Sequence, residues 1–504
     1  MPADLELDHV VSRLSLDLLI GGERRTASDG GEIDVIDPSN RVTIASVAAA
    51  SAGDVQDAIE AARQAQIVWW SWPHGRRAEV LNQVAALIRR DAALLAHVES
   101  LDTGKPLAQA RTDVEVAAQY FSFYAGLADK LYGSTIPLGP RDFAATFREP
   151  LGVTGHIVPW NYPLQISART VAPSLAAGNA AVLKPAEEAP LTALLLGAIV
   201  DESGAPPGLL NVVPGLGAIA GAALAGDDGI DHLSFTGGEV AGRLVMAALG
   251  RNLKPSTMEL GGKSPSLVFQ DADLDRAIPV LTRALIQNSG QTCSAGSRVI
   301  VHRSRHDELV GRLAEAFRQV RLGSGWEDLD MGPVISGKQY EQVLTAIADA
   351  RQEGAELVTG GPLATASATA GHLPEASTSG WYVHPTLLTE VSRRMDVAQK
   401  EVFGPVLCVL AVDSEDEAVD VANGTEFGLI ASVWTGSVDR AARVGRRLHC
   451  GQVYVNSYGA GGGVALPFGG VRKSGFGREK GVEAAYAYTQ TKVIAFSVEA
   501  REGP

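Results

Sequence analysis

Four short apolar segments follow one another in the middle of the chain: V-T-G-H-I-V (153–158), A-A-V-L-K (180–184), L-L-N-V-V (209–213) and I-D-H-L-S-F (230–235). Each has the length of a buried strand, and stretches of helical character separate them. Strands that alternate with helices predict βαβ units and a parallel sheet. These segments therefore predict an α/β fold.

Polar or glycine-rich segments stand where three of these strands end, namely P-W-N-Y-P (159–163), K-P-A-E (184–187) and F-T-G-G-E-V-A-G (235–242). Open parallel sheets bind ligands at this edge. The glycine turn at 237–242 opens a helix, whose free N–H groups and positive dipole end can hold a phosphate. A second glycine segment, P-G-L-G-A-I-A-G (214–221), also follows a strand, and the pattern alone leaves both open.

Lys184 and Glu187 stand at one of these strand ends. A carboxylate there can accept hydrogen bonds from a ribose diol, to which a lysine can donate. A solvated Lys-Glu pair at a helix start explains the same residues equally well, so the pair by itself does not decide between the two.

Composition limits the classes of partner. The chain has 504 residues, of which 46% are hydrophobic, and its net charge is −15. It can bury a large core in more than one domain, and it has no basic surface for nucleic acid or an anionic membrane. The acidic start M-P-A-D-L-E-L-D and the short apolar run from Leu191 predict a cytoplasmic protein with no membrane partner. Helical periodicity at 77–100 predicts one amphipathic surface helix.

The three cysteines differ in their surroundings. Cys408 lies in the apolar run V-L-C-V-L and Cys450 in L-H-C-G-Q, and both are typical of packing residues. Cys293 instead lies among small polar residues in N-S-G-Q-T-C-S-A-G-S-R (288–298). The chain shows neither a disulfide framework nor zinc-ligand spacing, so no metal is predicted and Cys293 is expected to be a free, reactive thiol.

Read together, the ordered segments P-W-N-Y-P, K-P-A-E, F-T-G-G, M-E-L-G-G-K-S-P, G-Q-T-C, E-V-F-G-P-V and P-F-G-G closely resemble the aldehyde dehydrogenase superfamily. The resemblance runs from about residue 18 to residue 492. It implies a Rossmann-like parallel-sheet NAD-binding domain (1–131 and 152–260), an α/β catalytic domain (261–475) and a small β oligomerisation or bridging segment (132–151 and 476–504).

The same resemblance assigns the catalytic residues. Cys293 is expected to attack an aldehyde and form a thiohemiacetal, with Asn161 and the Cys293 backbone N–H forming an oxyanion hole. Hydride loss then leaves a thioester, and Glu259 is expected to activate the water that hydrolyses it.

The resemblance also implies a binding site for NAD. It places Lys184 and Glu187 at the adenosine ribose, and it favours the 237–242 turn for the pyrophosphate over Gly215 and Gly217. The remaining cofactor residues are expected to be Trp160, Gly237, Gly238, Gly242, Glu401 and Phe403. Gly238 stands where many members have a serine, and Glu187 favours NAD over NADP because it would repel a 2′-phosphate.

The substrate is less constrained, and Arg169 and Tyr162 are expected to contact it. Arg169 stands where succinic semialdehyde dehydrogenases have a carboxylate-binding arginine, but Gln287 replaces their second arginine. Small residues in the loop at 456–466 favour a bulky aldehyde instead. A carboxylated semialdehyde substrate and a CoA-acylating reaction remain alternatives. Well-known acylating members, however, lack the glutamate that is present here as Glu259.

The C-terminal run T-K-V-I-A-F-S-V (491–498) predicts an exposed strand whose free edge would pair with another chain. Since family members are dimers or tetramers, the resemblance implies a homodimer or homotetramer.

Overall fold

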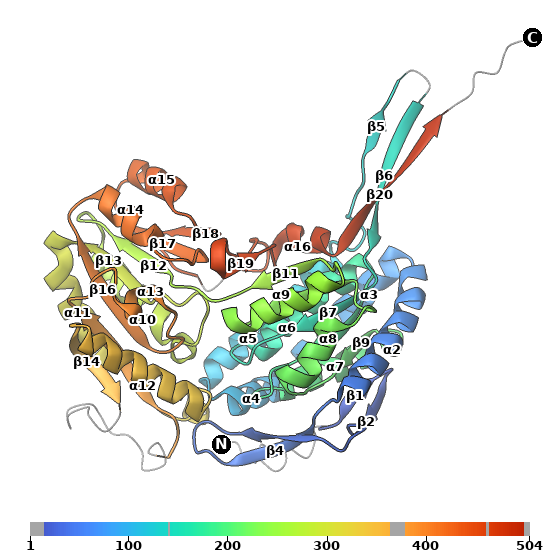
Figure 1. Cartoon of the computed structure of the whole chain (residues 1–504), viewed down its shortest axis with the longest axis horizontal. Helices are drawn as coiled ribbons and strands as arrows, with labels where there is room; N and C mark the ends of the chain where they lie inside the picture. Colours follow the sequence, from blue (N-terminus) through green and yellow to red (C-terminus); the bar gives the residue numbers. More distant parts are fainter. Residues whose placement is uncertain (1–14, 140–141, 363–378, 460–462, 498–504) are drawn as a thin grey trace, which may run out of the picture.

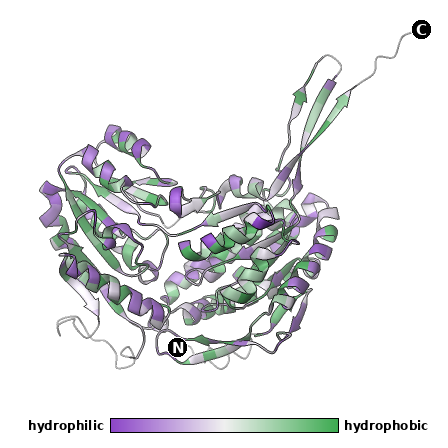
Figure 2. Cartoon of the chain, viewed as in Figure 1, coloured by the Kyte–Doolittle hydropathy of each residue, from purple (hydrophilic) through white to green (hydrophobic). Residues whose placement is uncertain are grey.

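The structure, a computed structural model, describes residues 15–139, 142–362, 379–459 and 463–497. Two lobes, each built on a β-sheet, lie side by side (Figure 1). A long β-arm projects from the first lobe, which lies on the right in the figure. Strands of both sheets are largely apolar, while polar residues lie along the outer helices (Figure 2).

The first lobe contains an eight-stranded sheet whose order is β19-β11-β10-β7-β8-β9-β1-β2. Neighbouring strands from β11 to β9 run parallel, whereas β19, β1 and β2 pair antiparallel at the two ends. The four predicted strands are confirmed as β7 (Val153–Ile157), β8 (Ala180–Lys184), β9 (Leu210–Val212) and β10 (His232–Thr236). The other strands are β1 (Leu18–Ile20), β2 (Glu23–Arg25), β11 (Ser256–Glu259) and β19 (Gly475–Phe476).

Helices cover this sheet and connect its strands. They are α2 (Ala52–Ser71), α3 (His74–Arg90), α4 (Ala92–Thr103), α5 (Leu107–Ala125), α6 (Pro163–Ala177), α7 (Leu191–Glu202), η1 (Gly217–Gly221), α8 (Ala222–Gly226), α9 (Glu239–Arg251) and α16 (Gly481–Ala487). A hairpin of β3 (Glu32–Ile36) and β4 (Thr43–Ala48) precedes α2. Ser51 and Asp54 form a reciprocal capping box that starts α2.

The prediction of an amphipathic surface helix at 77–100 is confirmed for residues 77–90, in which Leu81, Val84 and Ile88 are buried, but a single helix over the whole range is wrong. The segment forms the end of α3 and most of α4, which are separated at Asp91. Asp91 lies outside helical geometry, with φ −96° and ψ 14°, and its carboxylate binds Arg90. Aspartate is unfavourable inside a helix because its side chain competes for local hydrogen bonds. Residues 95–103 of α4 are buried, so the helix is not amphipathic along its whole length.

The second lobe contains a seven-stranded sheet with the order β14-β15-β16-β13-β12-β17-β18. Its strands are β12 (Pro265–Val268), β13 (Arg298–His302), β14 (Glu356–Pro362), β15 (Val383–Thr389), β16 (Val406–Val412), β17 (Ile430–Trp434) and β18 (Gln452–Val455). Its helices are α10 (Leu274–Ile286), α11 (His306–Arg318), α12 (Gly337–Gln352), α13 (Asp396–Gln399), α14 (Glu415–Asn423) and α15 (Val438–Arg447).

Each face of the second sheet has its own apolar core. Along β16, Cys408 and Leu410 pack on one face, and Leu407 and Val409 pack on the other. This alternation is the two-residue period of a strand buried on both sides. Cys408 is fully buried, which confirms it as a packing residue.

The arm is a three-stranded antiparallel sheet of β5 (Thr135–Pro137), β6 (Asp142–Pro150) and β20 (Thr489–Ser497). The predicted C-terminal strand is confirmed through Ser497, and Val498 lies outside the described residues. In the described part of the arm, β20 pairs with β6 along its whole length and has no partner on its other edge.

Candidate active site

The loop that carries Cys293 has an unusual backbone. It follows η2 (Gln287–Gly290), in which Asn288, Ser289 and Gly290 have φ values of 49°, 57° and 75°. A Cβ at position 290 would lie 2.2 Å from the carbonyl oxygen of Gly404, so only glycine fits. Gly290 thereby allows the loop to pack closely against the segment that contains Glu401 and Phe403.

Asn161 contacts this loop directly. It lies between β7 and α6, and its Nδ2 donates to the carbonyl oxygen of Gln291 at 2.9 Å. The side chain of Asn288 in turn donates to the carbonyl oxygen of Asn161 at 2.8 Å. The end of β7 therefore holds an amide donor against the cysteine loop, two residues before Cys293.

Glu259 ends β11 and is 2% exposed. Among the described residues neither of its carboxylate oxygens has a hydrogen-bond partner. Burial raises the pKa of this carboxyl well above its usual range, and the charge of Glu479 raises it further. A carboxyl group with this environment holds a proton more readily than a surface glutamate does, as a general acid-base group requires.

Cys293 keeps some solvent-accessible area, but its surroundings largely exclude water. Burial raises the pKa of its thiol to about 12, while the positive charge of Arg169 opposes the shift. The negative charges of Glu401 and Glu259 add to it. The thiol of the free protein is therefore mainly protonated at neutral pH, and the fraction of thiolate grows as the pH rises.

The glycine turn at 237–242 connects β10 to the start of α9. A Cβ at Gly237 would lie 2.7 Å from the ring of Phe235, and one at Gly242 would lie 2.8 Å from Leu260. Both glycines therefore permit close packing of the helix on the sheet. Gly238 caps the helix without a side-chain hydrogen bond, which leaves N–H groups at the helix start to bind an anion.

Lys184 and Glu187 form a salt bridge of 3.0 Å at the end of β8. Burial acts to raise the pKa of Glu187, but the charge of Lys184 and hydrogen bonds, including one from the Gly217 backbone, outweigh it and keep the pKa low. Both glycine segments thus contribute to this sheet edge: Gly217 contacts Glu187, and Gly237 lies beside Glu259, whose carbonyl oxygen accepts its N–H at 3.0 Å.

Trp160 and Phe403 come from different lobes and meet edge to face, with ring centroids 5.3 Å apart. Glu401 lies close by in sequence, and its Oε1 accepts a hydrogen bond from Gly262 N–H at 2.9 Å. Burial raises the pKa of Glu401 to about 7. The three predicted residues thus line the boundary between the lobes.

Tyr162 lies beside the same cysteine loop. Its hydroxyl lies 2.9 Å from Thr292 Oγ1 and accepts a hydrogen bond of 2.8 Å from Gln287 Nε2. Gln287 therefore places a neutral side chain where a semialdehyde enzyme would have its second arginine, and the amide N–H of Gln287 is already hydrogen-bonded to Tyr162. Part of the loop at 456–466 lies outside the described residues.

Arg169, predicted to bind a substrate carboxylate, is 4% exposed and pairs with Glu479. It also donates to Thr236 Oγ1 at 3.2 Å, and the other carboxylate oxygen of Glu479 accepts a hydrogen bond from Ser234 at 2.7 Å. An internal carboxylate thus already balances its charge. Glu479 and its neighbour Lys480 are not among the residues predicted from the sequence, although both lie in a polar run, G-R-E-K-G (477–481), shortly after P-F-G-G.

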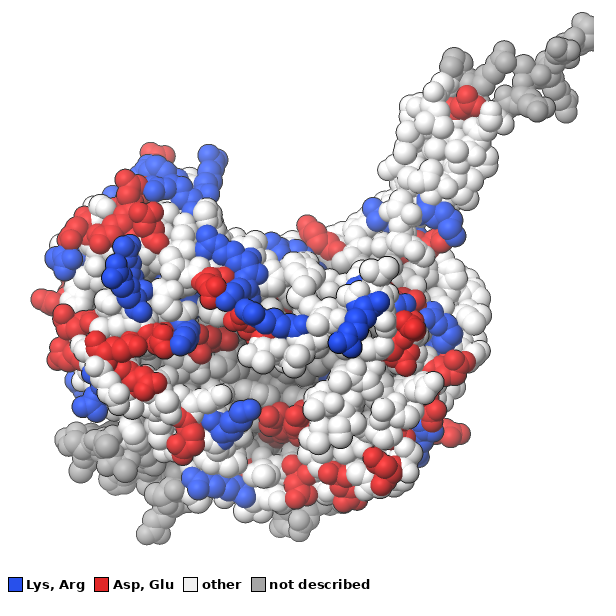
Figure 3. All heavy atoms as spheres, viewed as in Figure 1, with Lys and Arg blue, Asp and Glu red and all other residues white. Residues whose placement is uncertain are grey.

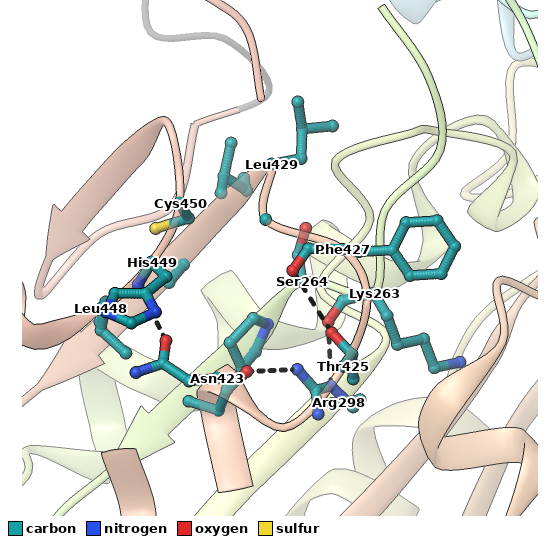
Figure 4. A pocket seen from close by; sticks show the side chains of 15 residues that line it. Lys263, Ser264, Arg298, Asn423, Thr425, Phe427, Leu429, Leu448, His449 and Cys450 are labelled. Carbon is teal, nitrogen blue, oxygen red and sulfur yellow. Dashed lines mark hydrogen bonds between the residues drawn. The ribbon is translucent and has the colours of Figure 1, made fainter. Parts of the chain in front are cut away.

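A small pocket lies in the second lobe (Figure 4). Its lining includes Lys263, Arg298, Asn423 and Cys450, but none of the three predicted catalytic residues. Arg298 is tied to main-chain carbonyl oxygens, including that of Lys263 at 2.9 Å. The lining of this pocket therefore does not supply the reactive groups.

On the face drawn in Figure 3, acidic and basic side chains are interspersed. Across the described ranges, no group of three or more His, Cys, Asp or Glu residues is arranged to hold a metal ion. No helix in that part of the chain is both long and apolar enough to cross a membrane.

Comparisons with known proteins identify the class. The sequence pattern of the aldehyde dehydrogenase family matches residues 25–494. Human (Homo sapiens) retinal dehydrogenase 2 is 38% identical, and the match covers 99% of this chain and 98% of the relative. The chain therefore belongs to the aldehyde dehydrogenase family.

Solved structures agree with this assignment. A putative aldehyde dehydrogenase from Burkholderia cenocepacia is 48% identical with a TM-score of 0.92, over 96% of this chain and all of the other. The NAD⁺ complex of an aldehyde dehydrogenase from Bacillus cereus is 37% identical with a TM-score of 0.92, over 96% of each chain. The α/β fold class and the aldehyde-oxidising enzyme class predicted from the sequence are confirmed.

Proposed function

We propose that this protein oxidises an aldehyde to a carboxylic acid with NAD, using Cys293 as nucleophile and Glu259 as general base. The observation that carries the proposal is the contact of Asn161 with the cysteine loop at 2.9 Å. This contact holds the side-chain amide of Asn161 next to the loop of Cys293, the cysteine that lies among small polar residues.

The residues at the strand ends fit NAD. The uncapped start of α9 suits a pyrophosphate, and Glu187 beside Lys184 suits a ribose diol. Trp160, Phe403 and Glu401 would hold the nicotinamide end. When bound, NAD supplies the acceptor for the hydride that the substrate releases.

The first half of the reaction forms a bond between Cys293 sulfur and the aldehyde carbon. The thiol first loses its proton to water, and the sulfur electron pair forms the new bond while the carbonyl oxygen gains the negative charge. Asn161 Nδ2 and the Cys293 N–H would donate to this oxygen, and such donors act most strongly where water is excluded. Re-formation of the C=O bond then releases a hydride from the carbon, which NAD would accept, and leaves the thioester. The small residues Ser294 and Ala295 beside the thiol leave room for the substrate.

The second half hydrolyses the thioester. Glu259 would take a proton from water while that water attacks the acyl carbon, and Cys293 leaves as thiolate. The buried carboxyl group of Glu259 has no hydrogen-bond partner among the described residues, and its pKa is raised, so its affinity for a proton exceeds that of a surface glutamate. Its presence favours water over coenzyme A as the acyl acceptor.

The structure supports a neutral aldehyde better than a carboxylated semialdehyde. Arg169 is compensated by Glu479, and Gln287 donates to Tyr162. A carboxylated substrate would have to compete with Glu479 for the guanidinium. We therefore retain the semialdehyde and the CoA-acylating reaction only as alternatives.

We also propose that the protein is a homodimer or homotetramer that assembles through the arm. The arm exposes large apolar side chains, including Phe147, Val493 and Ile494, and the free edge of β20 offers main-chain hydrogen bonds. The domain bounds 1–131 with 152–260, 261–475, and 132–151 with 476–504 remain predictions, as does a cytoplasmic location.

NADH formation tests the proposed reaction. Absorbance at 340 nm should rise when the protein receives NAD and an aliphatic or aromatic aldehyde, without coenzyme A, and the organic product should be the free acid. A requirement for coenzyme A, with an acyl-CoA product, would contradict the hydrolytic assignment. A rise with carboxylated semialdehydes alone would favour the semialdehyde alternative.

A further inference from the structure

Lys480 combines a strained backbone with a buried side chain. Its φ of 63° and ψ of 173° lie in a region that is almost restricted to glycine. The residue is only 5% exposed. Strain of this kind persists where the surroundings impose it, and it is concentrated at functional sites.

The side chain of Lys480 is directed toward Phe468. Its Nζ lies 5.0 Å from the centroid of the Phe468 ring, and Arg169 Cζ lies 5.3 Å from the same centroid. The main chains of Phe468 and Glu479 exchange two hydrogen bonds of 2.6 and 2.7 Å. Two cations therefore contact one buried aromatic ring, and a rigid main-chain bridge fixes the segment that carries Lys480.

The reactive groups of the proposed mechanism meet around the same ring. Cys293 packs against the apolar cluster that contains Phe468. Glu259 reaches the next residue, Gly469, so closely that a Cβ there would lie 2.6 Å from Oε1. Lys480, Cys293 and Glu259 thus all lie around the segment of Phe468 and Gly469.

The charges around Lys480 come from each segment that packs there. Arg169 comes from α6, Glu259 from β11, Cys293 from its loop and Glu479 from the adjacent position in the chain. Arg169 is balanced by its salt bridge to Glu479. The positive charges of Arg169 and Lys480 both act to lower the pKa of Cys293 and the pKa of Glu259.

Lys480 itself can change charge near neutral pH. Burial lowers its pKa to about 7, and the charge of Arg169 lowers it further, while Cys293, Glu479 and Glu259 oppose the shift. Below this pH the ammonium form predominates. The charge that Lys480 offers is therefore largest in neutral to mildly acidic solution.

We propose that Lys480 is a positioning residue for the chemistry at Cys293: its ammonium group stabilises the thiolate of Cys293 and the carboxylate of Glu259. The inference rests on the proposed function, because it assigns Lys480 a role in the reactivity of that nucleophile. No bond to Lys480 forms or breaks. Its positive charge adds to that of Arg169, which also acts to lower the pKa of Cys293.

Alkylation of Cys293 by iodoacetamide tests this role without turnover. The full-length protein is alkylated between pH 6 and 9.5, and mass spectrometry measures the modified peptide that contains Cys293. Lys480→Met removes the charge, Lys480→Arg keeps it, and Lys480→Gly removes it while also relieving the backbone strain. Thermal unfolding of each variant controls for damage to the fold.

At pH 6.5, Lys480→Met and Lys480→Gly should slow alkylation about tenfold, whereas Lys480→Arg should stay within about threefold of the wild type. The difference in alkylation rate between the wild type and these two variants should become smaller as the pH rises past 7, since Lys480 then loses its proton. Lys480→Gly keeps the test valid if Lys480→Met does not fold. Identical pH profiles in the wild type and Lys480→Gly would overturn the role of Lys480.

The test separates this role from the proposed function. If complete alkylation of Cys293 leaves aldehyde oxidation intact, the nucleophile itself is misassigned and the proposed function fails. If alkylation abolishes oxidation but its rate is independent of Lys480, only the inference about Lys480 fails.

Discussion

Arg169 and Glu479, separated by 310 positions in the chain, form a salt bridge in which their side chains are only 5% and 3% exposed. The pair joins α6 to the segment before α16 and lies beside Cys293 and Glu259. A buried pair of this kind stabilises the fold chiefly because neither charge can be left alone. Because Glu479 already balances the charge of Arg169, a substrate carboxylate would have to compete with Glu479 for the guanidinium group.

Arg169→Ala should lower the free energy of unfolding by about 3–5 kcal/mol, because it leaves the Glu479 carboxylate buried without its partner. Glu479→Gln in the same chain should restore part of that loss. Denaturant titration of the two single variants and the double variant measures the coupling. Unchanged stability with a KM increase confined to carboxylated aldehydes would instead support the substrate role predicted from the sequence.

Gly290→Ala should disturb the cysteine loop. The new Cβ would lie 2.2 Å from a backbone oxygen at a φ of 75°, so we expect a loss of about 2 kcal/mol or more together with a lower kcat. Gly311→Ala is the matched control, because its helix position has room for a methyl group and should gain about 0.5–1 kcal/mol. Equal effects of the two substitutions on unfolding would contradict the geometry of the loop.

Much of this architecture can be predicted from the sequence because its signals are local. The strands at 153–158 and 180–184 are recognisable from length and apolar character, and Cys293 from its polar neighbours. The break at Asp91 was missed because helical periodicity continues on both sides of it. Glu479 and Lys480 are not predicted because their importance depends on contacts that no local pattern encodes, with Arg169 for Glu479 and with the Phe468 ring for Lys480.

Glu187→Ser should narrow the preference for NAD over NADP. The carboxylate can accept hydrogen bonds from both ribose hydroxyls, but it would repel a 2′-phosphate at the same place. The substitution should therefore weaken NAD use and improve NADP use, with Lys184 left to bind the phosphate. Measured kcat/KM for the two cofactors checks this, and a wild-type ratio of one or below would overturn the role of Glu187.

Binding of NAD should tighten as the pH rises from 6 to 8. Burial raises the pKa of Glu401 to about 7, so the carboxyl is mainly protonated at pH 6 and mainly ionised at pH 8. The ionised form is the better acceptor for ribose hydroxyls. Quenching of tryptophan fluorescence gives Kd across this range, and the same pH dependence in Glu401→Gln would show that another group is responsible.

The most direct test of the account is pre-steady-state NADH formation in Glu259→Gln, with Cys293→Ala as the control. If Cys293 forms the acyl intermediate and Glu259 acts in its hydrolysis, Glu259→Gln should give a burst of about one NADH per active site followed by slow turnover. Cys293→Ala should give no NADH while it still binds NAD. Turnover in Cys293→Ala would contradict the role of Cys293 as nucleophile. A Glu259→Gln variant that forms no burst of NADH, like Cys293→Ala, would contradict a role of Glu259 confined to hydrolysis.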